Sequence, residues 1–221
     1  MSVLLAPSIL AADFLNLGAG VELVNEHADI FHLDVMDGIL VPNLSFGFPV
    51  VDAIAKKARK PLDVHLMIVK PWNYFQRFAK SGAHMISFHL EAARLDSKNA
   101  SELLKELKGL GVKAGLAINP DIPVEDVFPY LDDADFGLIM RVFAGFGGQK
   151  FIPESIERIE KLKAELTRRG LADKCKIEVD GGVGAGNSAD LAKAGAEILV
   201  AGSSVFRAEN PAEACVAIKH S

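Results

Sequence analysis

The chain has 221 residues, of which half are hydrophobic and 24% are charged, and its formal net charge is -5. This length is enough for one large domain with its own core, and the negative charge argues against nucleic acid or an anionic membrane surface as a partner. The N-terminal segment has no basic flank and is interrupted by Pro7, and no stretch reaches the ~20 apolar residues of a membrane span. Two cysteines, Cys175 and Cys215, fit neither a disulfide framework nor a metal knuckle, so we expect a cytoplasmic protein.

Eight short apolar segments rich in strand-forming residues follow one another along the chain. They begin at Val3, Ile30, Leu62, His84, Lys113, Phe136, Lys176 and Glu197. Segments of helical period lie between them, such as residues 101–111, which end on a glycine, and residues 153–170, which have proline at the start and glycine at the end. This alternation indicates an α/β protein with a parallel sheet, and eight such pairs predict a (β/α)8 TIM barrel formed by a single domain over residues 1–221. An open doubly wound sheet is the alternative that the strand count does not exclude.

Three of the predicted strands carry polar side chains on one face, because side chains alternate along a strand. The residues that share these faces are His32, Asp34 and Met36, then Asp63, His65 and Met67, and finally Glu178 and Asp180. The aliphatic face of each strand is expected to pack under the helices, so the polar face looks into the barrel, where an unpaired carboxylate is costly. Any one of these residues alone is more often a hydrogen-bonded core residue. Together, two imidazoles and two carboxylates favour a site for Zn²⁺ or Fe²⁺, with His32, Asp34, His65 and Asp180 as its ligands.

Glycine-rich loops follow the last three predicted strands, at residues 144–149, 180–187 and 201–204. Glycine lets backbone N–H groups approach an anion closely, and barrels often hold a phosphate after strands seven and eight, although tight turns also require glycine. The third glycine of a dinucleotide motif falls on Asn187, so we do not expect NAD. Other candidates close strands two, three, four and six. They are Met36, Met67 and Met140, as core residues or an apolar lid, and His89 and Glu91, as supports of the site or core hydrogen-bonding groups.

The chain resembles the ribulose-phosphate 3-epimerase family over nearly its whole length. The motifs are APSILAADF at 6–14, HLDVMDGILVPN at 32–43, DVHLM at 63–67, SFHLEA at 87–92, GFGGQKFI at 145–152, EVDGGV at 178–183 and VAGSSVF at 200–206. The resemblance implies a (β/α)8 barrel that interconverts D-ribulose 5-phosphate and D-xylulose 5-phosphate, an isomerase reaction of the pentose phosphate pathway. It also implies one divalent metal per subunit, Zn²⁺ or Fe²⁺, a small-molecule sugar phosphate as the partner, and a homo-oligomer.

The resemblance also assigns roles to particular residues. His32, Asp34, His65 and Asp180 match the metal ligands. Asp34 and Asp180 match the acid/base pair, because inversion at C3 requires one group to remove a proton and another to return one to the opposite face of a planar enediolate. The residues expected to bind substrate are Ser8, Met36, His65, Met67, Met140, Gly145, Gly147, Gly148, Gly181, Gly182, Gly202 and Ser203.

One loop departs from the family pattern. After the methionine of strand six the family usually has a small hydroxyl residue and then Val-Asn-Pro-Gly, whereas this chain reads Arg141-Val142-Phe143-Ala144-Gly145. Three outcomes are open: an altered substrate, a slower enzyme in which Arg141 helps to hold phosphate, or a rearranged loop. D-Allulose 6-phosphate is the alternative substrate. A metal-free isomerase and a catalytically silent phosphate-binding barrel are the alternative classes, and the complete set of metal-ligand candidates argues against the silent barrel.

Overall fold

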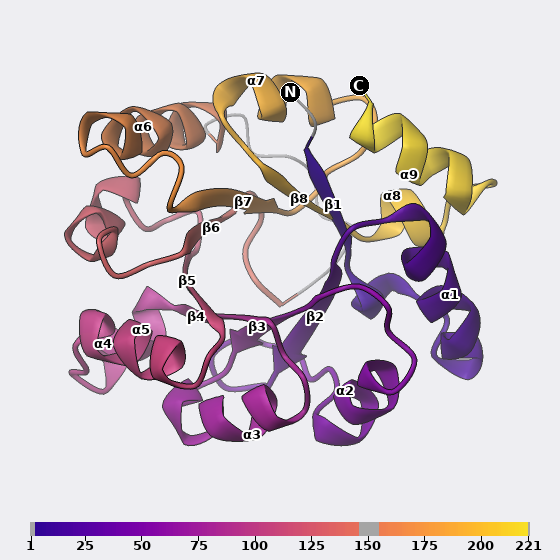
Figure 1. The fold of residues 1–221 in the computed structure, drawn as a ribbon, viewed down its shortest axis with the longest axis horizontal. Coiled ribbons are helices and arrows are strands. Elements are labelled where there is room, and N and C mark those ends of the chain that lie inside the picture. Colours follow the sequence, from indigo (N-terminus) through magenta and orange to yellow (C-terminus); the bar gives the residue numbers. More distant parts are fainter. Residues whose placement is uncertain (1–2, 146–154, 221) are drawn as a thin grey trace.

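Eight parallel strands surround the centre of the molecule, and helices form a ring outside them (Figure 1). The computed structural model describes residues 3–145 and 155–220. The strands are β1 Leu4–Pro7, β2 Phe31–Met36, β3 Leu62–Met67, β4 Met85–His89, β5 Lys113–Ile118, β6 Phe136–Met140, β7 Lys176–Asp180 and β8 Ile198–Ala201. Each lies within one of the eight segments predicted from the sequence, so the prediction of a (β/α)8 barrel is confirmed.

The barrel closes between its first and second strands. The continuous ladder runs in the order β1-β8-β7-β6-β5-β4-β3-β2. The remaining seam is closed by a parallel bridge between Ser8 and His32 and by hydrogen bonds from the backbone N–H groups of Asp29 and Ile30 to the Leu5 carbonyl oxygen, at 3.0 and 3.2 Å. This closure excludes an open doubly wound sheet.

Helices connect successive strands on the outside of the barrel. The α-helices are α1 Leu17–His27, α2 Phe48–Ala55, α3 Phe75–Lys80, α4 Leu90–Leu95, α5 Ala100–Gly109, α6 Ser155–Arg168, α7 Ser188–Ala194, α8 Ser203–Phe206 and α9 Pro211–Lys219. Short 3-10 helices are η1 Ile9–Ala11, η2 Phe14–Asn16, η3 Pro71–Asn73 and η4 Val124–Tyr130. Both helices predicted from periodicity are present as α5 and α6, although the predicted start of the second, at Pro153, lies outside the described residues. Over the described ranges, none of the helices has the length and apolar character required to cross a membrane.

The interior of the barrel is apolar at its floor and polar above it. Phe136 on β6 is buried with Ile30, Met85 and Ile198 beneath the polar residues. A Cβ atom on Gly115 would lie 2.2 Å from the Phe136 ring, so glycine at this point of β5 leaves the space that the ring fills. The outward-facing aliphatic residues of the strands belong instead to the large core shared with the helices. A solid floor of this kind confines any ligand to one end of the barrel.

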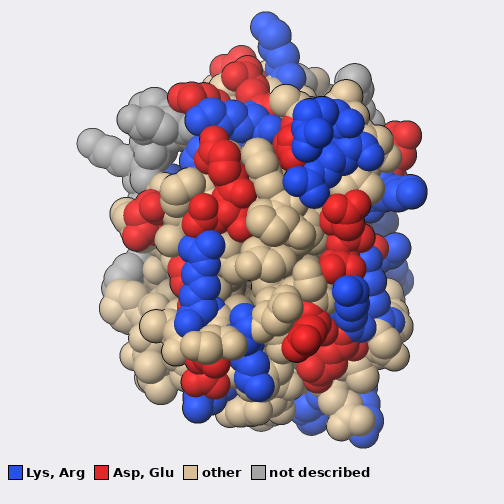
Figure 2. Space-filling view, turned by 90° about the vertical axis from the view of Figure 1, so that its left-hand side faces the viewer, with Lys and Arg blue, Asp and Glu red and all other residues tan. Residues whose placement is uncertain are grey.

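Charges of both signs are interspersed on the face of the molecule that carries α5, η4 and α6 (Figure 2). Several of them form ion pairs between elements, including Arg169 with Asp132 at 3.1 Å and Lys161 with Glu125 at 3.2 Å. The described residues of this face therefore present no broad surface of one sign of the kind that binds nucleic acid.

Candidate active site

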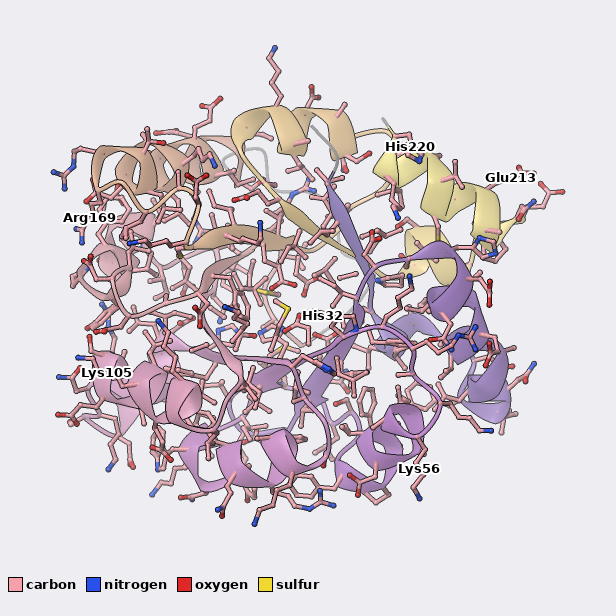
Figure 3. All side chains as sticks on the ribbon, in the orientation of Figure 1. His32, Lys56, Lys105, Arg169, Glu213 and His220 are labelled. Carbon is pink, nitrogen blue, oxygen red and sulfur yellow. The ribbon has the colours of Figure 1, made fainter. Side chains whose placement is uncertain are left out.

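The carboxyl ends of β2, β3 and β7 bring the predicted polar residues together inside the barrel. In the β2–β3 ladder, His32 lies beside Asp63 and Asp34 lies beside His65, so each strand contributes one imidazole and one carboxylate. His32 lies near the barrel centre, whereas charged residues such as Lys56 and Arg169 project outward (Figure 3). The side-chain alternation predicted from the sequence therefore produces one buried cluster.

Asp34 lies at the centre of this cluster. Its Oδ1 atom is 3.2 Å from Nε2 of His32 and 3.2 Å from Nδ1 of His65, while its Oδ2 atom accepts a hydrogen bond from the Ser8 hydroxyl. Asp180, the last residue of β7, completes the set. His32, Asp34, His65 and Asp180 each offer one ligand atom, and these atoms all lie within 4.8 Å of one another. The four predicted residues can therefore hold a metal ion together.

A second pair of carboxyl groups lies deeper in the barrel and contacts the other nitrogen of His32. Nδ1 of His32 is 2.6 Å from Oδ2 of Asp63 and 3.4 Å from Oε1 of Glu178. Burial, together with the nearby charge of Asp63, raises the pKa of Glu178 well above its ordinary value. An ionised carboxylate can only accept a hydrogen bond, so a carboxylate on Asp63 requires a proton on Nδ1 and orients the His32 ring with Nε2 toward Asp34.

The electrostatics of the cluster favour positive charge at its centre. Burial by itself lowers the pKa of His32, but Asp34 and Asp63 outweigh it and raise that pKa well above the ordinary value. Burial and the charge of Asp34 raise the pKa of Asp180 to about 7. Burial lowers the pKa of His65 to about 4, so this imidazole is neutral at physiological pH. The cluster is therefore a buried site of carboxylates and imidazoles in which a bound cation would be electrostatically favourable.

A cavity of about 270 Å³ opens above this cluster at the carboxyl ends of the strands. Many of the residues predicted to bind substrate line it: Ser8, Met36, Met67, Met140, Gly145, Gly181, Gly182, Gly202 and Ser203. Asp34 and Asp180 line it as well, whereas His32 and His65 are fully buried below. The predicted Gly147 and Gly148 lie outside the described residues. The three methionines pack together with Val41 and Ala144 in one small apolar cluster, which is the arrangement expected of a wall over the reacting atoms.

Glycine at position 181 is required by the approach of two loops. Gly181 has a φ of 115°, and a Cβ atom there would lie 2.8 Å from Cγ2 of Val142. The loop after β7 can therefore lie directly against the loop after β6 only when residue 181 has no side chain.

The loop that departs from the family pattern enters the cavity in part. Val142, Phe143 and Ala144 line the cavity. Arg141 does not line it: its side chain is fully buried, and its Nε atom donates to the Ser155 hydroxyl at 3.3 Å. Arg141 therefore does not face the cavity that the described residues line, and a role for it in holding phosphate stays a prediction. The local reason is strand alternation, because Met140 faces the interior and the next side chain faces the helices.

Several residues at the site were not assigned a role from the sequence. Asn43 lines the cavity and donates from Nδ2 to the Gly145 carbonyl oxygen at 2.7 Å. Arg207 also lines it, directly after α8. Among the described residues, Arg207 contributes the one cationic side chain of the cavity wall.

Glu91, expected at the end of β4, lies instead in the first turn of α4, because the strand ends at His89. Position 43 lies within a quoted motif, whereas no motif marks Arg207.

The closed barrel and its mouth define a class of protein. An apolar floor, a polar cluster and a cavity at the carboxyl ends of the strands are the organisation of a (β/α)8-barrel enzyme, in which loops at this end carry the chemistry. A family model described as "Ribulose-phosphate 3 epimerase family" matches residues 4–206. The chain belongs to this family.

Curated relatives agree with the family match. A ribulose-phosphate 3-epimerase of Synechocystis sp. is 45% identical over 221 residues, covering 100% of this chain and 94% of the relative. A ribulose-phosphate 3-epimerase of Bacillus subtilis is 44% identical over 202 residues, covering 91% of each chain. Among solved structures, 3-hexulose-6-phosphate synthase of Salmonella typhimurium superposes with a TM-score of 0.69 at 17% identity, covering 98% of this chain and 96% of the other. That likeness concerns the fold alone.

Proposed function

We propose that this chain catalyses epimerisation at C3 of D-ribulose 5-phosphate to D-xylulose 5-phosphate, with Asp34 and Asp180 as the acid/base pair. The observation that carries the proposal is that both carboxylates line one cavity, together with the Ser8 hydroxyl and the methionine cluster. Family membership supplies the substrate, and the cavity supplies space for a small molecule at the end of the barrel where such enzymes react.

The cluster below the cavity fits a divalent metal. Oδ1 of Asp34 lies 3.2 Å from Nε2 of His32 and 3.2 Å from Nδ1 of His65, so both imidazoles converge on one carboxylate oxygen. A proton on Nε2 of His32 satisfies the contact between His32 and Asp34 alone, whereas one metal ion would be shared by His32, Asp34, His65 and Asp180. Two imidazoles and two carboxylates suit Zn²⁺ or Fe²⁺. Such an ion would supply Lewis acidity toward the oxygen that becomes negatively charged at C2.

The protein's own groups supply the proton transfers. Abstraction of the C3 proton by one carboxylate gives a planar enediolate, and donation of a proton by the other carboxyl group to the opposite face gives the epimer. Asp180, with a pKa of about 7, can hold and release a proton near neutral pH. Ser8 binds Oδ2 of Asp34 and so limits the orientations available to that carboxylate. Each direction of the reaction exchanges the roles of Asp34 and Asp180.

The phosphate end of the substrate is assigned to the loops after β7 and β8. Gly181, Gly182, Gly202 and Ser203 line this part of the cavity, and Gly147 and Gly148 are retained as part of the same proposal. Arg207 adds a positive charge to the described wall, which suits a phosphate dianion.

The test is incubation of the zinc-loaded protein with D-ribulose 5-phosphate in D₂O, with NMR detection at C3. We expect deuterium at C3 as D-xylulose 5-phosphate appears, and loss of both signals in Asp34→Asn and Asp180→Asn variants that remain folded. D-Allulose 6-phosphate is run in parallel. Exchange on the hexulose phosphate alone would refute the pentose assignment, and absence of exchange on both would refute the proposed activity.

We also propose that the chain forms a homo-oligomer and acts in the cytoplasm. Two large apolar side chains that border the same groove, Ile39 and Leu44, are 73% and 72% exposed. Ile39 and Leu44 border a groove with Phe46 and Tyr74, and such a surface is typical of a protein interface. Light scattering of Ile39→Arg, compared with Val216→Arg on α9 as a control, should show dissociation only in the first variant. A parent chain that is monomeric at micromolar concentration would refute the oligomer.

A further inference from the structure

A chain of hydrogen bonds leads from the loop after β6 to the candidate metal ligand on β3. It begins at the backbone N–H of Ala144, which donates to Oδ1 of Asn119 at 3.0 Å. Asn119 then donates to Oε1 of Glu91 twice, from its backbone N–H at 3.0 Å and from Nδ2 at 2.9 Å. Because a backbone N–H can only donate, the atom of Asn119 that faces Ala144 must be the oxygen, and the amide nitrogen must therefore face Glu91.

The same logic fixes the next two links. Oε1 of Glu91 is 3.4 Å from Nδ1 of His89, and Nε2 of His89 is 2.9 Å from Nε2 of His65. Burial by itself would raise the pKa of Glu91, but His89 and the backbone donors lower it, so this group is an ionised acceptor. Oε1 of Glu91 accepts both donors of Asn119, so Nδ1 of His89 must carry the proton of the next link, and a neutral His89 ring then offers a lone pair at Nε2. With His89 in this form His65 donates from Nε2, which leaves on Nδ1 the lone pair that a cation shared with Asp34 requires.

We propose that Asn119, Glu91 and His89 are positioning residues that fix the tautomer of His65. Nδ1 of His65 then presents its lone pair to the centre of the cluster, 3.2 Å from Oδ1 of Asp34. The relay gives His65 the form in which a neutral imidazole binds a divalent cation. This inference rests on the proposed metal site, because without a cation the contact of Nδ1 with Oδ1 of Asp34 calls for a proton on Nδ1.

The relay also connects the cavity wall to the metal-binding cluster. Ala144 lines the cavity, and its backbone N–H is held by the same Asn119 side chain that orients Glu91. Arg158 of α6 anchors this junction, because its guanidinium donates to the carbonyl oxygens of Asn119 and Met140 at 2.9 and 3.0 Å. Asn119 is therefore the residue through which the position of Ala144 and the orientation of the relay depend on one another.

The first test observes the ring protons directly. Long-range ¹H–¹⁵N spectra of histidine-labelled protein, recorded with and without Zn²⁺, distinguish a protonated from an unprotonated ring nitrogen. In the sample with Zn²⁺ we expect His89 to be protonated on Nδ1 and not on Nε2, and His65 to be protonated on Nε2 and not on Nδ1; the sample without Zn²⁺ shows which of these protons the metal moves. Assignment uses single His65→Gln and His89→Gln variants. With Zn²⁺ bound, a proton on Nδ1 of His65, or on Nε2 of His89, would overturn the relay.

The second test measures Zn²⁺ affinity by competition with a chromophoric chelator. Glu91→Gln replaces the obligatory acceptor with a neutral amide of the same shape, and we expect binding about tenfold weaker, within the range for groups that orient a ligand. Glu102→Gln removes the same charge from an exposed position in the first turn of α5 and serves as the control. Equal affinity in the two variants would overturn the proposal. Asn119→Ala should weaken Zn²⁺ binding and also raise KM, because it releases Ala144.

These readouts separate the relay from the proposed reaction. Expected tautomers and weaker Zn²⁺ binding in Glu91→Gln, in a protein that epimerises neither sugar phosphate, would leave the relay standing and remove the assigned activity. Epimerisation with the opposite His65 tautomer would retain the activity and remove the relay.

Discussion

Replacing Asp180 with asparagine should stabilise the metal-free protein while it abolishes turnover. Burial and the neighbouring charge of Asp34 raise the pKa of Asp180 from 3.8 to about 7. At about 1.4 kcal/mol per pH unit, keeping this carboxylate ionised in the folded protein costs about 4 kcal/mol. Because Asp180 is only half-buried at the cavity wall, solvent screening reduces the expected figure to about 2 kcal/mol. Asparagine removes the charge and therefore most of this cost.

The sign of the effect depends on pH in a defined way. Below about pH 4 the carboxyl group is protonated in the folded and unfolded chains, so the substitution should change stability little. Between about pH 4 and 7 only the unfolded chain ionises, so the parent loses stability as pH rises. Above pH 7 the full difference is present, and about 2 kcal/mol corresponds to a Tm increase of about 4–8 °C for a chain of this size.

The assay is thermal unfolding at pH 4 and pH 8 with a chelator present, followed by C3 exchange on the zinc-loaded protein. Asp173→Asn, at an exposed position before β7, controls for the change of net charge. We expect a higher Tm at pH 8 only in Asp180→Asn, with turnover reduced by roughly 10²–10⁴-fold. A lower Tm at pH 8 would show that the carboxylate stabilises the fold, and retained turnover would remove Asp180 from the acid/base pair.

Three further predictions concern other groups. Arg207→Gln should raise KM for the sugar phosphate roughly three- to tenfold, because it removes the positive charge beside the phosphate loops. Lys174→Gln, at the opposite end of the barrel, is the control. The same increase of KM in this control would refute a specific role of Arg207 and indicate a general effect of charge. Zn²⁺ binding should weaken as pH falls from 8 to 6, because the metal must displace protons from His32 and from Asp180, whose pKa is about 7. Titration calorimetry that detects no proton release on Zn²⁺ binding would contradict this prediction. Burial raises the pKa of Cys175 to about 12 and of Cys215 to about 11. Neither thiol should therefore react with a disulfide reagent at pH 8 until the protein unfolds. Rapid labelling of the native protein would refute this expectation.

Much of the fold and the cluster follows from local rules. Strand and helix segments alternate along the chain, and a period of two places His32 and Asp34 on the interior face and their neighbours under the helices. The same period sends Arg141 outward after Met140. These conclusions need only the spacing of residues within one strand, so they can be reached without knowledge of how the strands pair.

The relay could not be obtained in this way. Asn119 follows β5, Glu91 lies in the first turn of α4, and Ala144 follows β6, so their contact depends on three separate segments reaching one place. Asparagine and glutamate after strands are common in turns and helix starts, and their residue types give no sign of a shared partner. Arg207 has the same limitation, because only the folded loop shows that it borders the cavity.

The seam between β1 and β2 links closure of the barrel to the candidate active site. A closed sheet opens most readily where it has the fewest backbone hydrogen bonds, which in this barrel is the seam between β1 and β2. The seam is held by the Ser8–His32 bridge and by the hydrogen bond from the Ser8 hydroxyl to Asp34. Ser8, which we propose to contact the substrate, therefore also helps to close the barrel. Local separation of β1 from β2 at this point would remove the hydrogen bond that Ser8 donates to Asp34, and a ligand that binds Asp34 and Ser8 together would in turn stabilise the closed barrel.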